Sequence, residues 1–234
     1  MRALSYSSIK EFAKSPNHLL NYWSRESKPS QSMILGSAFH CLLLEPEKFN
    51  ERYAVAPDVD KRTKEGKFQF EQFALSAEGR EVITQGDYQT IQYMAAAARI
   101  DDVILMDIQA EIEVSGEING VPFRGFVDGL HDKYIVDVKT TRSAHPDDFM
   151  RDAANLKYHL QAAIYLELTG RKDYFILAVE NNQPFNVQLY QMTEDMIEKG
   201  REELFILTEK YKIWDGTPSG YSEKCLKLDL PYWY

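Results

Sequence analysis

Residues 121–141 contain two runs of alternating apolar and polar residues that are joined by a short polar turn. The runs cover 121–130 and 134–140, and His131-Asp-Lys lies between them. Alternation with a period of two is typical of strands, so this segment predicts a β-hairpin. The second strand begins with Tyr134-Ile-Val, which is apolar enough for a central position in a sheet. The fold must therefore be built around this hairpin.

Three charged residues lie on the predicted hairpin. Asp137 and Lys139 are two residues apart, so their side chains leave the same face of the strand, and the turn brings Asp128 opposite Asp137. We expect Asp137 and Lys139 to lie at the exposed end of the strand. Carboxylate oxygens are the ligands that Mg²⁺ prefers, and a lysine beside the cation can position the attacking water. The simpler alternative is an exposed ion pair beside a hairpin aspartate, because Asp-x-Lys is a common tripeptide.

The remaining pattern predicts an α/β fold in which helices flank a central mixed, mostly antiparallel sheet. No repeat or linker interrupts the 234 residues, which predicts a single domain with a helical part at 1–108 and a catalytic core at 109–234. Helices are expected over 4–12, 15–23, 33–44, 68–78, 87–99, 158–169 and 193–211, and further strands over 110–115, 174–179 and 185–191. The helix at 33–44 is apolar nearly all round, so we expect it to be buried.

The formal net charge of −9 argues against a protein that simply coats nucleic acid. An acidic enzyme can still bind DNA where positive charge is concentrated locally. Candidate phosphate contacts are Arg62, Lys64, Arg124 and Arg142, each of which could equally be a solvated surface charge.

Cysteine usage and hydropathy predict a cytoplasmic protein without membrane partners. Cys41 and Cys225 are far apart and fit no metal-binding spacing, so both are expected to be buried apolar residues. No run approaches the roughly 20 apolar residues that cross a membrane. The first residues lack the apolar region of a signal peptide.

Five segments, taken in order, resemble one nuclease family. Gly125-x-x-Asp128 precedes Asp137-x-Lys139-Thr, Gly36-x-x-x-His40 lies upstream, and Tyr158-x-x-Gln161-x-x-x-Tyr165 follows. Together with 5–10 and 62–67, they resemble the RecE-like exonucleases of the PD-(D/E)xK superfamily in its RecB-type form. The resemblance runs from Leu4 to about Leu168.

The resemblance assigns roles to particular residues. It implies metal ligands at His40, Asp128, Asp137 and Val138, and a water-positioning lysine at Lys139. Gln161 and Tyr165 lie on one helix face, so Gln161 could hydrogen-bond a catalytic carboxylate or water and Tyr165 a phosphate. A buried core histidine and a buried amphipathic helix are the alternatives. An acidic residue is also implied in the strand at 110–115, where Glu111 is favoured over Glu113.

The family implies a Mg²⁺-dependent exonuclease, with Mn²⁺ as a substitute, that digests linear double-stranded DNA from 5′ to 3′. It would leave single strands for recombination, with a single-strand annealing protein as a further partner. A closed trimer or tetramer is expected mainly because enzymes of this family enclose the duplex in a ring. The three aromatics that end the tail at 226–234 could find cover on another subunit or, alternatively, on their own subunit.

Two other functions stay open. The first is a RecB-type nuclease of other polarity, or an endonuclease, akin to the Cas4 proteins. Those proteins hold an iron–sulfur cluster with four cysteines, and the two distant cysteines of this chain cannot supply one. The second is a non-catalytic module that binds DNA ends.

Overall fold

The computed structural model describes residues 2–25, 29–99 and 102–221. Cys225 and the aromatic tail at 226–234 lie outside the described residues. Within those ranges, none of the helices combines the length and the apolar character that crossing a membrane requires.

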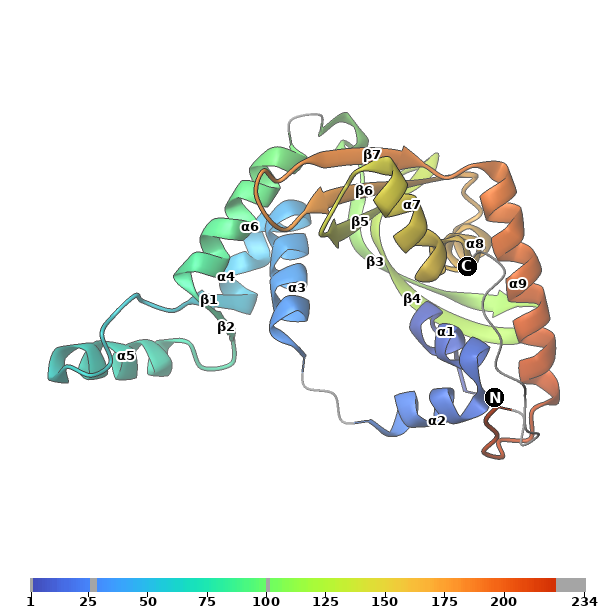
Figure 1. Ribbon diagram of the computed structural model, residues 1–234, viewed down its shortest axis with the longest axis horizontal. Coiled ribbons are helices and arrows are strands. Elements are labelled where there is room, and N and C mark those ends of the chain that lie inside the picture. The colour runs from blue at the N-terminus through green and yellow to red at the C-terminus, as the bar shows by residue number, and fades with distance from the viewer. Residues whose placement is uncertain (1, 26–28, 100–101, 222–234) are drawn as a thin grey trace, which may run out of the picture.

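A five-stranded sheet forms the centre of the described chain (Figure 1). Strands β5 and β6 are parallel, and the other neighbouring pairs are antiparallel. The predicted α/β fold with a mixed, mostly antiparallel sheet is therefore confirmed. In spatial order the strands are β3 (Gln109–Ile118), β4 (Val121–Leu130), β5 (Tyr134–Thr141), β6 (Asp173–Glu180) and β7 (Val187–Gln191).

The β3–β4 hairpin closes through a two-residue turn at Asn119-Gly120. Both residues have positive φ, 50° at Asn119 and 76° at Gly120. Asn and Gly adopt this conformation readily, and it matches the right-handed twist of the two strands. The turn fixes the register in which Ile118 pairs with Val121.

One face of the sheet is covered by helices from both ends of the chain. Buried side chains from α1, α8 and α9 join those of β4 and β6 in one hydrophobic cluster. Ser5 and Thr193 cap α1 and α9 by accepting hydrogen bonds from backbone N–H groups. The helices on this side are α1 (Tyr6–Lys14), α2 (Pro16–Ser24), α7 (Pro146–Asn155), α8 (Tyr158–Thr169) and α9 (Glu194–Ile213).

A second hydrophobic cluster lies on the opposite face of the sheet. Helices α3 (Gln31–Leu44) and α6 (Gln85–Ala98) pack there against Val136 and Val138 of β5. Each cluster takes residues from both parts of the chain, before and after residue 109. Short elements complete this side: η1 (Pro46–Lys48), α4 (Phe49–Arg52), β1 (Tyr53–Val55), β2 (Glu81–Ile83) and η2 (Asp102–Leu105).

Helix α5 (Lys64–Ser76) projects from the body of the molecule (Figure 1). It begins at Lys64, four residues before the expected start, because the Thr63 side chain caps it by accepting from Gly66 N–H. Phe68 and Leu75 are 61% and 72% exposed.

Candidate active site

Strands β4 and β5 separate where the charged residues lie. Their ladder contains the pairs Gly129–Val136 and Leu130–Ile135, and it ends before Asp128. There Asp128 Oδ2 accepts a hydrogen bond of 2.7 Å from the Val138 N–H. The carboxylate thus replaces the backbone carbonyl that would otherwise satisfy this buried N–H. The split between the strands makes room for side chains at this point.

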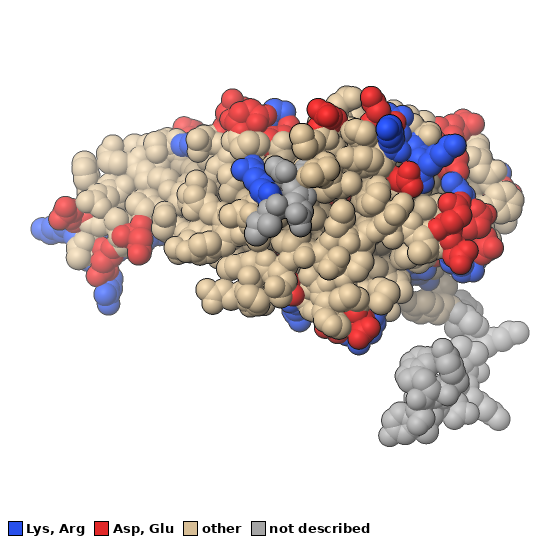
Figure 2. Space-filling view, turned by 90° about the horizontal axis from the view of Figure 1, so that it is seen from above, with Lys and Arg blue, Asp and Glu red and all other residues tan. Residues whose placement is uncertain are grey.

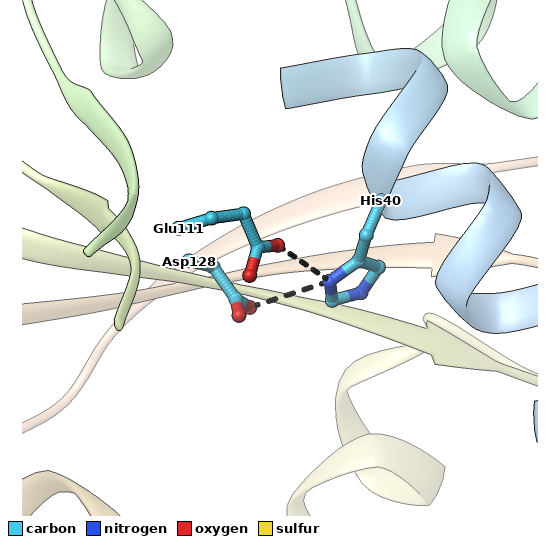
Figure 3. Close-up of side chains that lie close together, drawn as sticks. All are labelled: His40, Glu111 and Asp128. Carbon is cyan, nitrogen blue, oxygen red and sulfur yellow. Dashed lines mark ion pairs between the residues drawn. The ribbon is translucent and has the colours of Figure 1, made fainter. Parts of the chain in front are cut away.

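Three potential metal ligands converge beside the split (Figure 3). His40 of α3 approaches Asp128 and Glu111, with Nδ1 3.8 Å from Asp128 Oδ2 and 4.0 Å from Glu111 Oε1. One ligand atom from each residue lies within 4.8 Å of the other two. These separations exceed hydrogen-bonding distance, so the groups meet without bonding one another.

The donor set fits a hard divalent cation. Ligands held about 2.1 Å from one octahedral cation lie roughly 3–4 Å apart, close to the separations between His40 and the two carboxylates. Two carboxylates and one imidazole, completed by water, are a suitable donor set for a divalent metal cation. We refer to His40, Glu111 and Asp128 as the ligand cluster.

The backbone at Glu111 explains why this acid, and not Glu113, joins the ligand cluster. Glu111 faces Asp128 between the pairs Ala110–Gly129 and Ile112–Val127, but its φ of 51° is left-handed. A non-glycine residue in this conformation is strained and breaks the alternation of the strand. The two glutamates therefore differ in surroundings, since Glu113 forms an ion pair with Arg124. Burial, followed by the charge of Asp128, raises the pKa of Glu111.

Asp137 forms a separate, buried group with its neighbours. It is 2% exposed, its Oδ2 lies 2.6 Å from Lys139 Nζ, and its Oδ1 accepts a 2.8 Å hydrogen bond from Gln161 Nε2. The expectation that Asp137 and Lys139 lie at the exposed end of the strand is wrong for Asp137, because helix α8 covers this part of β5. The hydrogen bond expected from Gln161 to a carboxylate is present.

Burial and the charge of the ion-pair partner shift the pKa values of Asp137 and Lys139 in opposite directions. Burial raises the pKa of Asp137, Lys139 opposes that rise, and the nearby Asp128 adds to it. Burial lowers the pKa of Lys139, but the carboxylates of Asp137 and Asp128 outweigh it and hold the pKa above its usual value. Lys139 is therefore an ammonium, and it lies 5.1 Å from the centroid of the Tyr158 ring, within range of a cation–π interaction.

Two further expected site residues are enclosed by the fold. The Val138 side chain is buried in the second cluster, so only its carbonyl oxygen could be a ligand. Tyr165 is buried against β4, where a Cβ on Gly125 would lie 2.8 Å from Tyr165 Cε1. Gly125 thus permits the close packing of α8 on the sheet.

An open cleft of about 710 Å³ adjoins the ligand cluster. Met33, Gly36, Ser37 and His40 line one wall, and their spacing places them on one face of α3. The expectation that this helix is buried all round is therefore wrong for the cleft face. The other wall comes from the ends of β5 and β6 and from α7 and α8, and includes Thr140, Thr141, Arg142, Phe149, Asp152, Tyr158 and Asn181.

The candidate phosphate contacts are dispersed. Arg142 is exposed and lines the cleft. Arg124 is paired with Glu113, and Arg62 with Asp60, whose Oδ1 lies 2.9 Å from Arg62 Nε. Lys64 begins the projecting helix α5, away from the cleft (Figure 1). Of these four expected contacts, Arg142 is thus the one that lines the cleft together with His40.

The face seen from above carries scattered charges of both signs, including a basic group near its middle, and a broad area without charged side chains (Figure 2). It shows no extended basic area among the described residues. The described part of this face therefore offers no broad basic surface to a nucleic-acid backbone.

The sequence patterns missed several residues around the site. Helix α7, which contributes Phe149 and Asp152 to the cleft, was not predicted, although Pro146 at its first position and two following aspartates are typical of a helix start. Tyr174 of β6 is fully buried, and its pKa is raised by burial and by Asp137. A β6 strand pairing with β5 in parallel is needed to place it there, and no local signal gives that pairing.

Residues 5–230 match the family described as "PDDEXK-like domain of unknown function (DUF3799)". The match covers nearly the whole chain, and the chain belongs to this family. The expected PD-(D/E)xK relationship is therefore confirmed. The comparison with curated proteins gives no match.

Solved structures resemble the chain at low sequence identity. The structure described as "Putative exonuclease" from Eubacterium rectale has a TM-score of 0.68 and 16% identity, covering 98% of this chain and 90% of that one. A phage related exonuclease from Haemophilus somnus 129PT has a TM-score of 0.41 and 13% identity, covering 90% and 93%. An alkaline exonuclease from Laribacter hongkongensis has a TM-score of 0.36 and 15% identity, covering 71% and 92%. The first likeness shows a shared fold.

Proposed function

We propose that the protein is a metal-dependent nuclease that digests linear double-stranded DNA from an end. The observation that carries this proposal is the ligand cluster of His40, Glu111 and Asp128, which lies where β4 and β5 separate and opens to the cleft. The Val138 N–H bonded to Asp128 links this cluster to the strand that holds Asp137 and Lys139.

The ligand cluster would hold one divalent cation, Mg²⁺ or Mn²⁺. Such a cation, when bound, polarises a phosphate oxygen and lowers the pKa of a bound water. Asp128 would also keep the strands apart through its bond to Val138 N–H. Asp137 and the Val138 carbonyl, which the sequence resemblance adds to the ligand set, lie on the adjacent strand; Asp137 Oδ2 is paired with Lys139 in the described arrangement.

Lys139 would position the attacking water and offset the negative charge that develops on the phosphate. Asp137 keeps the lysine charged and fixes the direction of its ammonium group. Gln161 in turn orients Asp137 by donating to Oδ1. Arg142 on the cleft wall would contact a backbone phosphate. These roles divide the site into groups that hold the cation and groups that place the lysine.

The finer activity rests on the family resemblance and on the fold shared with the Eubacterium rectale structure, whose description names an exonuclease. We extend to this chain a 5′→3′ digestion that leaves single strands for recombination. A single-strand annealing protein would be the partner that receives them.

The decisive experiment compares linear duplexes labelled at the 5′ or the 3′ end with a covalently closed circle. Each is incubated with Mg²⁺, with Mn²⁺ and with EDTA. We expect early release of the 5′ label in either cation, an intact circle and no reaction in EDTA. A His40→Ala variant that keeps its folded spectrum should be inactive.

Other outcomes would replace the proposal. Early release of the 3′ label would reverse the polarity, and cleavage of the closed circle would indicate an endonuclease. Binding of linear ends without any digestion in either cation would identify a non-catalytic end-binding module.

A further inference from the structure

A surface rich in aromatic and arginine side chains extends beyond the cleft. It comprises two shallow pockets of about 400 and 430 Å³ that share Arg2, Tyr22 and Trp23. We call this surface the α2–β4 path, after helix α2 and strand β4, which form its walls. None of its residues belongs to the ligand cluster or to the Asp137–Lys139 pair.

Strand β4 provides one wall of the α2–β4 path. Arg124 and Phe126 are two residues apart, so their side chains leave the same face of the strand, and both are exposed, Phe126 by 51%. Their side chains border the pocket that also contains Tyr22 and Trp23. Phe126 precedes the ligand Asp128 by two residues, which corresponds to about 7 Å along a strand. The exposed Phe126 ring is thus separated from a member of the ligand cluster by only two positions along the strand.

Helix α2 and the N-terminal segment provide the other wall. The Arg2 guanidinium lies 4.6 Å from the centre of a Trp23 ring, so it stacks on the indole. Tyr22, the preceding residue on α2, is exposed. This wall therefore presents a cation and an aromatic surface side by side, facing Arg124 and Phe126 across the pocket.

The α2–β4 path is continuous with the cleft. Met33 of α3 lines the cleft together with His40, and it also lines the pocket that contains Tyr22 and Trp23. Met33 is 56% exposed and lines both spaces, so the two spaces adjoin at this side chain. A polymer that extends along the cleft past Met33 would reach this pocket next.

We infer that the α2–β4 path binds single-stranded DNA next to the site of cleavage, an inference that rests on the proposed nuclease function. Unpaired bases expose the flat faces that stack on Phe126 and Tyr22, whereas the bases of a duplex are already stacked on one another. Arg124 and Arg2 would contact the phosphates between those bases. A duplex would need a wider band of positive charge, and here Glu113 is paired with Arg124.

The test measures binding separately from digestion. A fluorescein-labelled dT12 oligonucleotide and a blunt 12-base-pair duplex are titrated by fluorescence anisotropy in EDTA with the full chain and with Phe126→Ala and Tyr22→Ala. The matched control is Phe205→Ala, which removes an exposed ring of the same kind as Phe126 from α9. Melting temperatures confirm that each variant is folded.

We expect each path variant to raise the Kd for dT12 by about fivefold or more, the range for loss of one stacked base, while Phe205→Ala changes it less than twofold. The Kd for the duplex should change by a smaller factor. Photo-crosslinking of a 5-iodouracil oligonucleotide, followed by mass spectrometry, should label Tyr22, Trp23 or Phe126 in the unmodified chain.

Unchanged dT12 binding in both path variants, or crosslinks confined to other elements, would overturn the inference. An equal loss of duplex binding would also overturn it, because the surface would then follow a duplex. Digestion of linear duplex in Mg²⁺ by the unmodified chain is scored on its own. Its absence would remove the nuclease function, whereas the EDTA titrations alone decide strand binding.

Discussion

At the scale of single residues, the site depends on a buried ion pair. Asp137 lies 2.6 Å from Lys139 and is covered by α8, so each charge is compensated mainly by the other. We predict that Asp137→Ala lowers the free energy of unfolding by about 2–4 kcal/mol, because the Lys139 ammonium loses its partner in a poorly solvated place. Turnover should also be lost. Urea denaturation and the end-labelled digestion assay measure the two effects.

The double variant Asp137→Asn/Lys139→Met is the control for this prediction. It removes both charges, so the free energy of unfolding should return to within about 1 kcal/mol of that of the unmodified chain while turnover stays absent. A single Asp137→Ala variant as stable as the unmodified chain would contradict the burial of the pair.

Lys139 should affect the chemical step more than DNA binding. We predict that Lys139→Ala lowers kcat by about 100-fold or more, because the lost ammonium acts on charge that develops in the transition state. The Kd for linear duplex should rise less than threefold, since one contact among several phosphate contacts is lost. Single-turnover digestion and anisotropy titrations separate the two quantities. Equal losses in both would make Lys139 an ordinary phosphate contact.

The sequence predicted the convergence at the site better than its detailed geometry. His40 and Asp128 were expected to converge with Asp137, and the family resemblance implied a further acid, with Glu111 favoured. The structure brings His40 and Asp128 together with Glu111, whereas Asp137 lies in a separate buried pair with Lys139. The left-handed backbone at Glu111 and the burial of Asp137 could not be proposed. Both depend on how the strand pairing ends and on which helix covers β5, and these are tertiary features.

At the scale of elements, α8 and α9 are joined by a cluster of charged groups. Glu203 of α9 lies 2.5 Å from Lys157 Nζ and 2.9 Å from His159 Nε2, at the start of α8. The hydrogen bond from His159 lowers the pKa of Glu203 to about 2, against the opposing effect of burial and with the help of Lys157. In the unfolded chain this carboxyl has a pKa of about 4.3.

The sign of the pH effect follows from that depression. The folded state holds the ionised form more strongly, so the contribution of Glu203 to stability is present above about pH 4.5 and is lost as the pH falls toward 2. We predict that Glu203→Gln lowers the free energy of unfolding by about 1–2 kcal/mol at pH 7, a value discounted for partial solvent exposure. The difference from the unmodified chain should shrink below pH 4.5. Urea denaturation between pH 7 and 3 measures it.

Glu202→Gln is the matched control, because Glu202 is more exposed and pairs with Lys199 on the same helix. It should change the free energy of unfolding by less than about 0.5 kcal/mol at every pH. A pH-independent effect of Glu203→Gln would contradict the depressed pKa.

Elements with a strong periodic pattern could be predicted from the sequence, and elements held by their neighbours could not. β4 and α8 begin and end at the predicted residues, because their patterns are bounded by a turn and by Gly170. In the described part of the chain, the three-residue strands β1 and β2 pair only with each other, and each is too short to show a periodic pattern. The parallel pairing of β5 with β6 reflects the α7–α8 crossover, whose first helix was missed.

At the scale of the whole molecule, α5 is the described element with least cover from the rest of the fold (Figure 1). Helices of this length draw most of their stability from packing, yet Phe68 and Leu75 are largely exposed. The sequence predicted a closed trimer or tetramer, and a contact between copies would cover these side chains. A ring also suits a net charge of −9, because only its channel need be positive.

We therefore predict that the purified chain has a molar mass about three or four times 27.1 kDa by light scattering at low micromolar concentration. Phe68→Ser/Leu75→Ser should shift the mass toward the monomer, because it removes apolar surface from α5 without touching either core cluster. The control is Phe205→Ser on α9, which should leave the mass unchanged. A 27.1 kDa monomer that persists with linear DNA present would refute the ring, and unchanged assembly of the double variant would exclude α5 from its interface.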